Sequence, residues 1–414
     1  MKKRLLTIII LILCFINVGA TVKEDFTLKF DCGNAVVKYV DLPIDANNHI
    51  VYEEIVTRKI NAPLCEKKQE ILKLIEEGVS EKQAVLTCFP RLESTFESIV
   101  EKVYQSPVDS QIKFNPNRET MFTISKEKSG KKVDEDAFYA DVVYALFFNK
   151  SQIKIRTIPV EPSVTIEDNK RFLYKKSTYS TSLASSSQNR KHNVERALES
   201  INGSVLQVGE ILSFNAKTGI RSEENGYKTA KIIVGNEYVD GVGGGVCQAS
   251  TTLYNSALLA GLQIDQVSSH SLLPSYVEPS FDAMVNTGSS DLVIRNNTSG
   301  PIFIKAYVIN DRATVIVYGC KNEYEIRKKS VTVSKGKPPE DKKIYDDKYF
   351  DKDDVVEYKR VSYSQPQLKS EGYLLYYRNG VKHKEEKIRE DNYNSKSGII
   401  AYRVENKTDA LIFL

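Results

Sequence analysis

One cysteine, Cys247, stands where a catalytic nucleophile is expected. It follows three consecutive glycines at 243–245, and apolar residues recur at helical spacing from Val246 to Ala260 until Gly261 ends the pattern. Cys247 therefore lies in the first turn of a predicted helix. The partial positive charge at a helix N-terminus favours thiolate over thiol, and the thiolate is the nucleophilic form of cysteine.

A general base for this thiol is available at His270, which follows a strand-like run at residues 262–267. A cysteine on a helix followed by a histidine after a later strand is the order found in papain-like and transglutaminase-like enzymes. Asp282 is the candidate for orienting the imidazole. Glu278 and backbone carbonyls compete with Asp282 for that role.

The glycine run is suited to stabilising an oxyanion. Glycine permits positive φ angles and leaves backbone N–H groups uncovered, so Gly244 and Gly245 are candidate contacts to a developing negative charge. A small buried cysteine beside a tight glycine turn is the structural alternative. Cysteine, glycine run and histidine in order within one short region favour catalysis. Further candidate substrate contacts are Gln248, Thr251, Tyr254 and Arg221, with plain helix surface as the alternative for the first three.

The elements that must position these residues span about 175–320. A helix is predicted over 189–201, ending at Gly203, and a hairpin over 229–239 with its turn at Gly235-Asn236. Strands are predicted over 290–295, 301–309 and 313–318. Helices combined with antiparallel strands predict an α+β domain.

The flanking regions predict two more modules, which makes the chain a multidomain α+β protein. Residues 26–161 mix helical and strand-like stretches, including predicted helices at 66–77, 95–104 and 134–148. Residues 321–414 read as a charged linker followed by a small β module with a hairpin turn at Asn379-Gly380. No residue there suggests chemistry.

The N-terminus predicts export. Residues 1–20 carry a basic start, a short apolar run and a small-residue end, as in a secretory signal. The run is short for a membrane span, so cleavage is favoured, although a retained signal would act as an anchor. Three of the four net positive charges lie within these residues, so nothing indicates a nucleic-acid partner. The cysteine spacings indicate no metal site, and disulfides among Cys32, Cys65, Cys88 and Cys320 stay open.

From about Thr178 to Tyr318 the chain resembles the VanW family. The shared motifs are Asn202-Gly203, Gly209-Glu210, Ser213-Phe214-Asn215, Gly226-Tyr227, residues 243–254, His270-Ser271 and Asp282-Ala283. Where family members often have glycine near the Asp-Ala pair, this chain has Ser280-Phe281. Upstream, residues 107–160 resemble the YoaR-type peptidoglycan-binding domain, and the C-terminal module is similar to the G-five domain.

The resemblance implies a peptidoglycan L,D-transpeptidase facing the cell wall of a Gram-positive bacterium. Cys247 would be the acyl-accepting nucleophile and His270 its base, with no metal or organic cofactor. The partners would be peptidoglycan stem peptides. The alternatives are a cysteine peptidase or carboxypeptidase acting on the same stems, and a non-catalytic scaffold that binds the cell wall.

Overall fold

The computed structural model describes residues 29–31, 36–37, 64–90, 92–148, 152–234, 237–351 and 354–404. The predicted signal at residues 1–20 and the predicted turn at Gly235-Asn236 lie outside these residues. Within them, no helix is long and apolar enough to cross a bilayer. Helices and mostly antiparallel strands alternate along the chain, which confirms the predicted α+β class.

The chain divides into two compact units, one of residues 1–110 and 126–165 and the other of residues 111–125 and 166–414. Strands β3 (Ile112–Phe114) and β4 (Phe122–Ile124) therefore belong to the second unit, although the sequence predicts one module over 26–161. Aromatic packing explains the difference. The rings of Phe114 and Phe122 lie 5.3 and 5.2 Å from that of Phe303.

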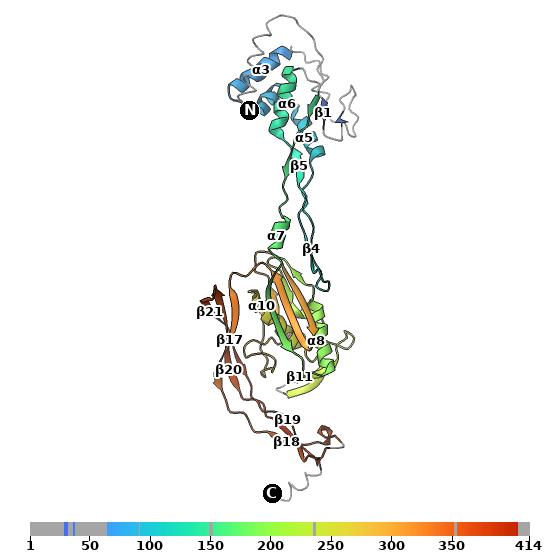
Figure 1. The fold of residues 1–414 in the computed structure, drawn as a ribbon, viewed down its shortest axis with the longest axis vertical. Helices are drawn as coiled ribbons and strands as arrows, with labels where there is room; N and C mark the ends of the chain where they lie inside the picture. Colours follow the sequence, from blue (N-terminus) through green and yellow to red (C-terminus); the bar gives the residue numbers. More distant parts are fainter. Residues whose placement is uncertain are drawn as a thin grey trace. The chain divides into compact units, whose positions relative to one another are not determined.

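The first unit is built around helices α3 (Leu64–Glu76), α4 (Glu81–Cys88), α5 (Leu92–Val103) and α6 (Glu135–Phe148), drawn in blue to green in Figure 1. Their core contains Ile71, Val85, Ile99 and Val142. The sequence prediction missed α4, whose start is capped by the Ser80 hydroxyl. The short strands are β1 (Lys29–Asp31), β2 (Val36–Val37), β5 (Gly130–Val133), β6 (Gln152–Lys154) and β7 (Thr157–Val160).

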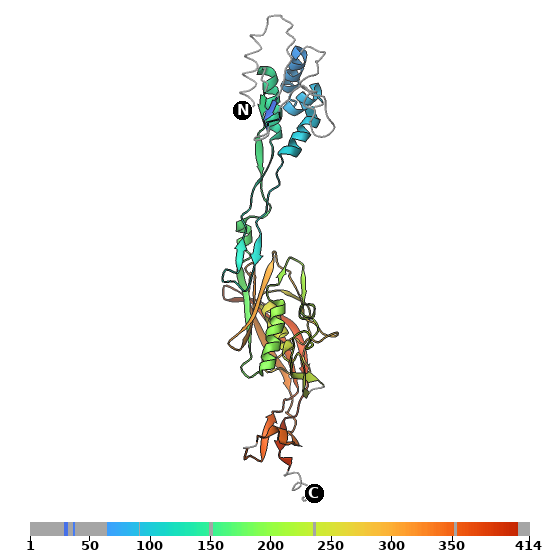
Figure 2. The ribbon, with the colours of Figure 1, turned by 90° about the vertical axis from the view of Figure 1, so that its right-hand side faces the viewer.

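The second unit centres on a four-stranded antiparallel sheet in the order β8-β16-β15-β9. Its strands are β8 (Tyr174–Ser182), β16 (Arg312–Gly319), β15 (Ile302–Ile309) and β9 (Val205–Leu206). Helices α8 (Gln188–Ile201) and α10 (Val246–Leu259) pack against it, and Figure 2 shows α8, in green, lying along the strands. Val194, Leu253 and Val315 share the resulting core. Both helices confirm the predicted helical periodicity.

Smaller elements complete the region around α10. Strands β10 (Ile211–Ser213), β14 (Val293–Arg295) and β13 (Gln263–Gln266) form one sheet, and β11 (Thr229–Val234) pairs with β12 (Glu237–Val242) as the predicted hairpin. The short helices are α7 (Ile166–Lys170) and α9 (Phe214–Thr218). The glycine run at 243–245 connects β12 to α10, and the chain continues from α10 into β13.

The residues after 320 do not form a module separate from this core. Strands β17 (Glu325–Lys335), β20 (Leu368–Arg378) and β21 (Val381–Tyr393) form a sheet that packs near α10 (Figure 1). Leu374 is buried in the core that contains α10, and Ile326 and Ile388 pack against that core. The predicted Asn379-Gly380 turn joins β20 to β21, with φ angles of 52° and 78°. Beyond this sheet lie β18 (Lys342–Tyr345), η1 (Asp347–Tyr349), β19 (Tyr358–Ser362) and β22 (Ile399–Tyr402).

Candidate active site

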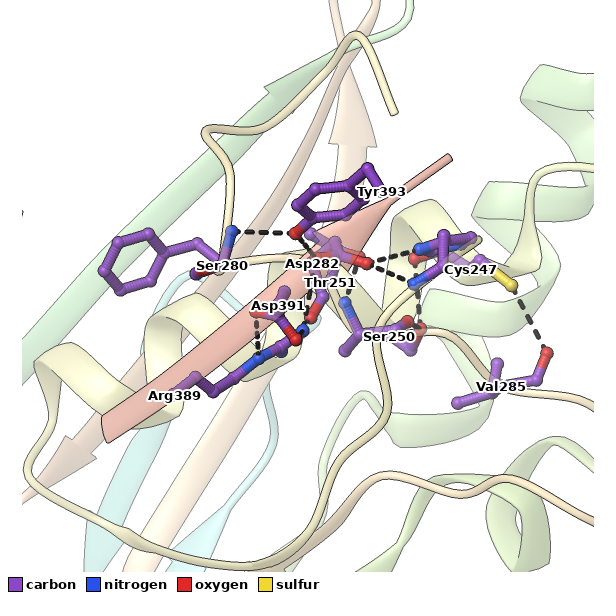
Figure 3. A network of polar contacts seen from close by, with 12 residues as sticks. Cys247, Ser250, Thr251, Ser280, Asp282, Val285, Arg389, Asp391 and Tyr393 are labelled. Carbon is purple, nitrogen blue, oxygen red and sulfur yellow. Dashed lines mark hydrogen bonds and ion pairs between the residues drawn. The ribbon is translucent and has the colours of Figure 1, made fainter. Parts of the chain in front are cut away.

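Cys247 is the second residue of α10 and half-buried. The helix is preceded by Gly243 and Gly245 with φ angles of 84° and 110°, which only glycine adopts without strain. The Cys247 thiol points to the Val285 carbonyl oxygen, 3.3 Å away (Figure 3). Among the described residues, the Cys247 backbone N–H has no hydrogen-bond acceptor. That N–H is therefore available at the nucleophile.

The glycine run passes between β11 and α8. A Cβ on Gly244 would lie 2.6 Å from the Ala230 carbonyl, and a Cβ on Gly245 would lie 3.1 Å from Val194. The amide of Asn193, on α8, donates to the Gly244 carbonyl oxygen at 2.9 Å. The run is consequently fixed by close packing and one buried hydrogen bond. Gly244 and Gly245 thus lie beside Cys247, as the sequence implies.

The structure brings His270 and Asp282 together. The His270 Nδ1 lies 2.6 Å from the Asp282 Oδ2, and the His270 backbone N–H donates to the same oxygen at 2.7 Å. His270 is 6% exposed and Asp282 is fully buried. Glu278, the competing carboxylate, is exposed and lies 3.9 Å from Lys328 instead. Asp282, rather than Glu278, therefore orients the imidazole.

The electrostatics favour an ion pair between Cys247 and His270. Burial raises the pKa of the Cys247 thiol, but a hydrogen bond with His270 and the imidazolium charge outweigh burial and hold that pKa below its ordinary value. Burial lowers the pKa of His270, but hydrogen bonds with Asp282 and Cys247 raise it to about 9. These shifts favour a thiolate beside an imidazolium over a neutral thiol beside a neutral imidazole.

Asp282 is held from the C-terminal sheet, where the sequence suggested no chemistry. The Tyr393 hydroxyl donates to the Asp282 Oδ1 at 2.7 Å, and Arg389 donates to the Asp282 carbonyl oxygen at 2.5 Å and to Oδ1 at 3.3 Å (Figure 3). Arg389 also pairs with the buried Asp391 at 2.8 Å. Although burial raises the pKa of Asp282, the hydrogen bond from His270 and the Arg389 charge keep it below its ordinary value. Asp282 therefore stays ionised.

A sequence signal for these residues exists in retrospect. Arg389, Asp391 and Tyr393 alternate along β21 and so lie on one face of the strand. A buried arginine, aspartate and tyrosine at this spacing need polar partners. The sequence does not say which partner lies opposite them.

The polar face of α10 anchors the segment that carries Asp282. Thr251 accepts a hydrogen bond from the Ala283 N–H at 2.9 Å, and Ser250 donates to the Ala283 carbonyl at 2.6 Å. Asn255 donates to the Phe281 carbonyl at 2.7 Å. Ser280 has a φ of 64°, a left-handed conformation that glycine adopts more readily. This matches the glycine found near this point in the family that the sequence resembles.

The additional candidate contacts divide into buried supports and one residue near the nucleophile. Gln248 is 1% exposed and donates to the Ser182 carbonyl at 2.8 Å. Thr251 and Tyr254 are also buried, and the Tyr254 ring lies 5.8 Å from the Arg389 guanidinium. These three side chains support the site and are not exposed to a substrate, because each lies on a buried side of α10. Arg221 is half-buried, and its charge contributes to the lowered pKa of Cys247.

Among the cysteines whose side chains are described, Cys88 and Cys320 form no hydrogen bond with His270 or Asp282. Cys88, Cys247 and Cys320 carry free thiols. Cys32 and the side chain of Cys65 lie outside the described residues, so the disulfide alternatives that involve them are not resolved here.

Replacing Arg389 with methionine is expected to lower the free energy of unfolding by about 3–5 kcal/mol, because Asp282 and Asp391 would lose the buried charge that they share. Denaturant titration measures this change. Lys329→Met is the matched control, because Lys329 lies in the same sheet and pairs with Glu385 at the surface, where such pairs contribute at most about 1 kcal/mol. Equal losses in the two variants would contradict a special role for Arg389.

Comparison with known proteins places this region in context. The family described as "VanW like protein" matches residues 189–318. "Uncharacterized protein YoaR" of Bacillus subtilis (strain 168) is 35% identical over 213 residues, which cover 50% of this chain and 67% of that protein. "Vancomycin B-type resistance protein VanW" of Enterococcus faecalis (strain ATCC 700802 / V583) is 29% identical over 117 residues, which cover 27% of this chain and 42% of that protein. A solved structure, "Crystal structure of HP0197-G5", matches 20% of this chain and 99% of its own at 12% identity with a TM-score of 0.11.

Proposed function

Because this chain belongs to the VanW family, we propose that it acts on the bacterial cell wall, as an L,D-transpeptidase that joins peptidoglycan stem peptides through 3→3 cross-links. The observation that carries the proposal is the Cys247–His270–Asp282 arrangement, in which the thiol has a lowered pKa and the imidazole a raised one. A cysteine at a helix start facing a histidine held by a carboxylate is the arrangement of papain-like and transglutaminase-like catalysis.

Acylation begins when the Cys247 thiolate attacks the carbonyl carbon of the third residue of a tetrapeptide stem. Negative charge develops on the carbonyl oxygen, and the uncommitted Cys247 N–H, with N–H groups of the glycine run, stabilises it. The C–N bond then breaks, and the His270 imidazolium gives its proton to the leaving D-alanine nitrogen. The products of this half-reaction are a thioester on Cys247 and free D-alanine.

Deacylation uses the same groups in reverse. An amine of a second stem attacks the thioester carbonyl, neutral His270 accepts the proton of that amine, and the C–S bond breaks to regenerate the thiolate. Asp282 keeps the imidazole in one tautomer throughout, because its Oδ2 accepts a hydrogen bond from Nδ1. Attack by water instead of an amine would make the same site a carboxypeptidase or an endopeptidase.

The proposal extends to the rest of the chain. Residues 1–20 act as the export signal, so the protein works outside the cytoplasm, in the wall or at the outer face of the membrane. The region over 26–161, which resembles the YoaR-type domain in part, binds peptidoglycan.

Activity is expected to depend on pH as a bell-shaped curve. It rises as the thiol ionises, at a pH below the ordinary cysteine value, and falls above pH 9 as His270, whose pKa is raised to about 9, loses the proton needed by the leaving amine. The two limbs describe the coupled pair as a unit. Initial rates of D-alanine release between pH 5 and 11 would measure the profile. Activity that still increases at pH 10 would contradict an imidazolium acid.

The decisive experiment incubates the protein with muropeptides that carry tetrapeptide stems and analyses the products by mass. Loss of D-alanine together with dimer formation supports transpeptidation. Loss of D-alanine without dimers identifies hydrolysis at the same site. Unchanged muropeptides that still bind would overturn the enzymatic proposal in favour of a wall-binding scaffold.

A further inference from the structure

Two arginines flank the glycine run that leads into Cys247. The Arg190 Cγ lies 3.0 Å from the position that a Cβ on Gly245 would occupy. The Arg221 Cβ lies 2.8 Å from the corresponding position on Gly243. One arginine therefore stands at each end of the run, from α8 on one side and from the segment after α9 on the other.

The head of Arg190 is held by neutral groups. Its Nη2 donates to the Gln248 Oε1 at 3.1 Å, and its guanidinium carbon lies 5.9 Å from the centre of the Tyr276 ring. Gln248 is itself fixed by the Ser182 carbonyl and the Thr181 hydroxyl. Within the part of the chain that the structure describes, the Nε and Nη1 of Arg190 have no acceptor. Arg190 thus keeps most of its donors uncommitted.

Arg221 is also held without a carboxylate. Its Nη2 donates to the Asn215 Oδ1 at 2.5 Å and to Thr218 at 3.2 Å, and its Nη1 donates to Thr287 at 3.2 Å. Both arginines are half-buried, and neither forms an ion pair with a described carboxylate, although the charge of Asp291 acts on Arg221 from further away. Two other arginines of this unit differ, because Arg295 pairs with Asp265 and Arg389 with Asp391.

Two restrained, unpaired guanidinium groups beside a nucleophile are suited to binding a carboxylate of the substrate. A guanidinium binds a carboxylate through two parallel N–H···O bonds, and partial burial strengthens them. His270 forms the hydrogen bond that lowers the pKa of Cys247 most, and the Arg221 charge adds a smaller effect from a distance. The guanidinium groups of Arg190 and Arg221 can therefore bind an anionic group of the substrate.

We propose that Arg190 and Arg221 form a carboxylate-binding subsite that grips the C-terminal carboxylate of the acyl-donor peptide. This inference rests on the proposed function, in which the bond cleaved is the last peptide bond of the stem. The carboxylate of the leaving amino acid is then one Cα away from the scissile nitrogen, within reach of a group next to Cys247. One additional residue would move that carboxylate about 3.5 Å further along the chain. The subsite thus selects tetrapeptide donors over longer ones.

The test compares two synthetic tetrapeptide donors, one with a free C-terminal carboxylate and one with a C-terminal amide. Release of the terminal residue is followed as kcat/KM. The wild-type protein is expected to prefer the free acid by about 10- to 100-fold, as for a charge-assisted hydrogen-bonded pair. Arg190→Gln should reduce that preference several-fold through slower reaction of the free acid, with the amide donor affected by less than about twofold. Arg221→Gln should slow both donors, because the Arg221 charge also lowers the pKa of Cys247, but it should slow the free acid several-fold more.

Two controls keep the comparison interpretable. Arg295→Gln removes an arginine that already pairs with Asp265, and its preference should equal that of the wild type. Arg190→Lys keeps the charge without the planar fork, so it should retain part of the preference. Equal treatment of both donors by the wild type, or equal losses on both donors in the two glutamine variants, would overturn the subsite. So would a preference that follows a side-chain carboxylate of the third residue rather than the C-terminus.

A binding measurement tests the carboxylate subsite independently of catalytic activity. Calorimetric titration of Cys247→Ala with the two donors needs no turnover. Tighter binding of the free acid that is lost on adding Arg190→Gln supports the subsite even if no product forms. Equal affinities for the two donors would overturn it even if the wild-type protein proves to be a transpeptidase.

Discussion

Replacing Cys247 with alanine is expected to abolish release of D-alanine from tetrapeptide stems, with a loss of about ten-thousandfold or more. No other described side chain at the site is a nucleophile. His270 and Asp282 transfer and orient a proton, and neither forms the thioester on which the second half-reaction depends. Mass analysis of muropeptides after incubation measures the loss. The alanine variant should still bind the stems, because only the sulfur atom is removed.

Cys320→Ala is the matched control for this prediction. Cys320 is also free and half-buried, and although burial raises the pKa of its thiol, the nearby Lys176 holds that pKa below its ordinary value. Both thiols therefore have a lowered pKa, but of the two only Cys247 has a histidine beside it. The Cys320 variant should retain full activity. Loss of activity in it, or activity that survives in Cys247→Ala, would rule out the assigned nucleophile.

Asp282→Asn is expected to lower kcat by about a thousandfold and to destabilise the fold as well. Every contact of the Asp282 carboxylate comes from a donor. Oδ2 accepts from the His270 backbone N–H and Nδ1, and Oδ1 accepts from Tyr393 and Arg389. Asparagine offers one oxygen and one NH2 group, so the NH2 group must face donors in either orientation. An NH2 group towards His270 would also favour the wrong imidazole tautomer.

The fall in kcat and the fall in stability are measured separately, by single-turnover release of D-alanine and by denaturant titration. The Tyr393 hydroxyl already accepts a hydrogen bond from the Ser280 N–H at 2.8 Å and donates its own proton to Asp282. If it accepted from the new NH2 group as well, its own O–H would lose its acceptor. Asp265→Asn, in a partly exposed pair with Arg295, serves as the control and should change neither quantity appreciably. A fully active Asp282→Asn variant would mean that the imidazole is oriented by another group.

The centre of the site follows from local sequence signals. The glycine run, the helix that begins at Val246 and the strand before His270 are each read within a few residues, because helix starts and strand periodicity are local properties. The structure has these elements as expected, with α10 at Val246–Leu259 and β13 at Gln263–Gln266. Asp282 was one of two candidate carboxylates after His270, and only its burial in the structure separates it from the exposed Glu278.

What the sequence did not predict depends on contacts far along the chain. Arg389 lies 107 residues from Asp282, and no local pattern names the partner of a strand residue. The burial of Gln248 and Tyr254 was missed for a related reason. The polar side of α10 is covered by β8 and by the segment around Ala283, whose backbone groups satisfy the polar side chains of the helix. The spacing of polar residues along a helix does not distinguish a polar face buried against backbone groups from a polar face exposed to solvent.

Because Arg389 follows Asp282 by 107 residues, the contact between them can form only late in synthesis of the chain. A ribosome makes Cys247 and His270 well before it reaches β21, and domains fold as their chains emerge. Until β21 docks, Asp282 lacks the arginine and tyrosine that hold its carboxylate, so the site is complete only when the last strand of this sheet is in place.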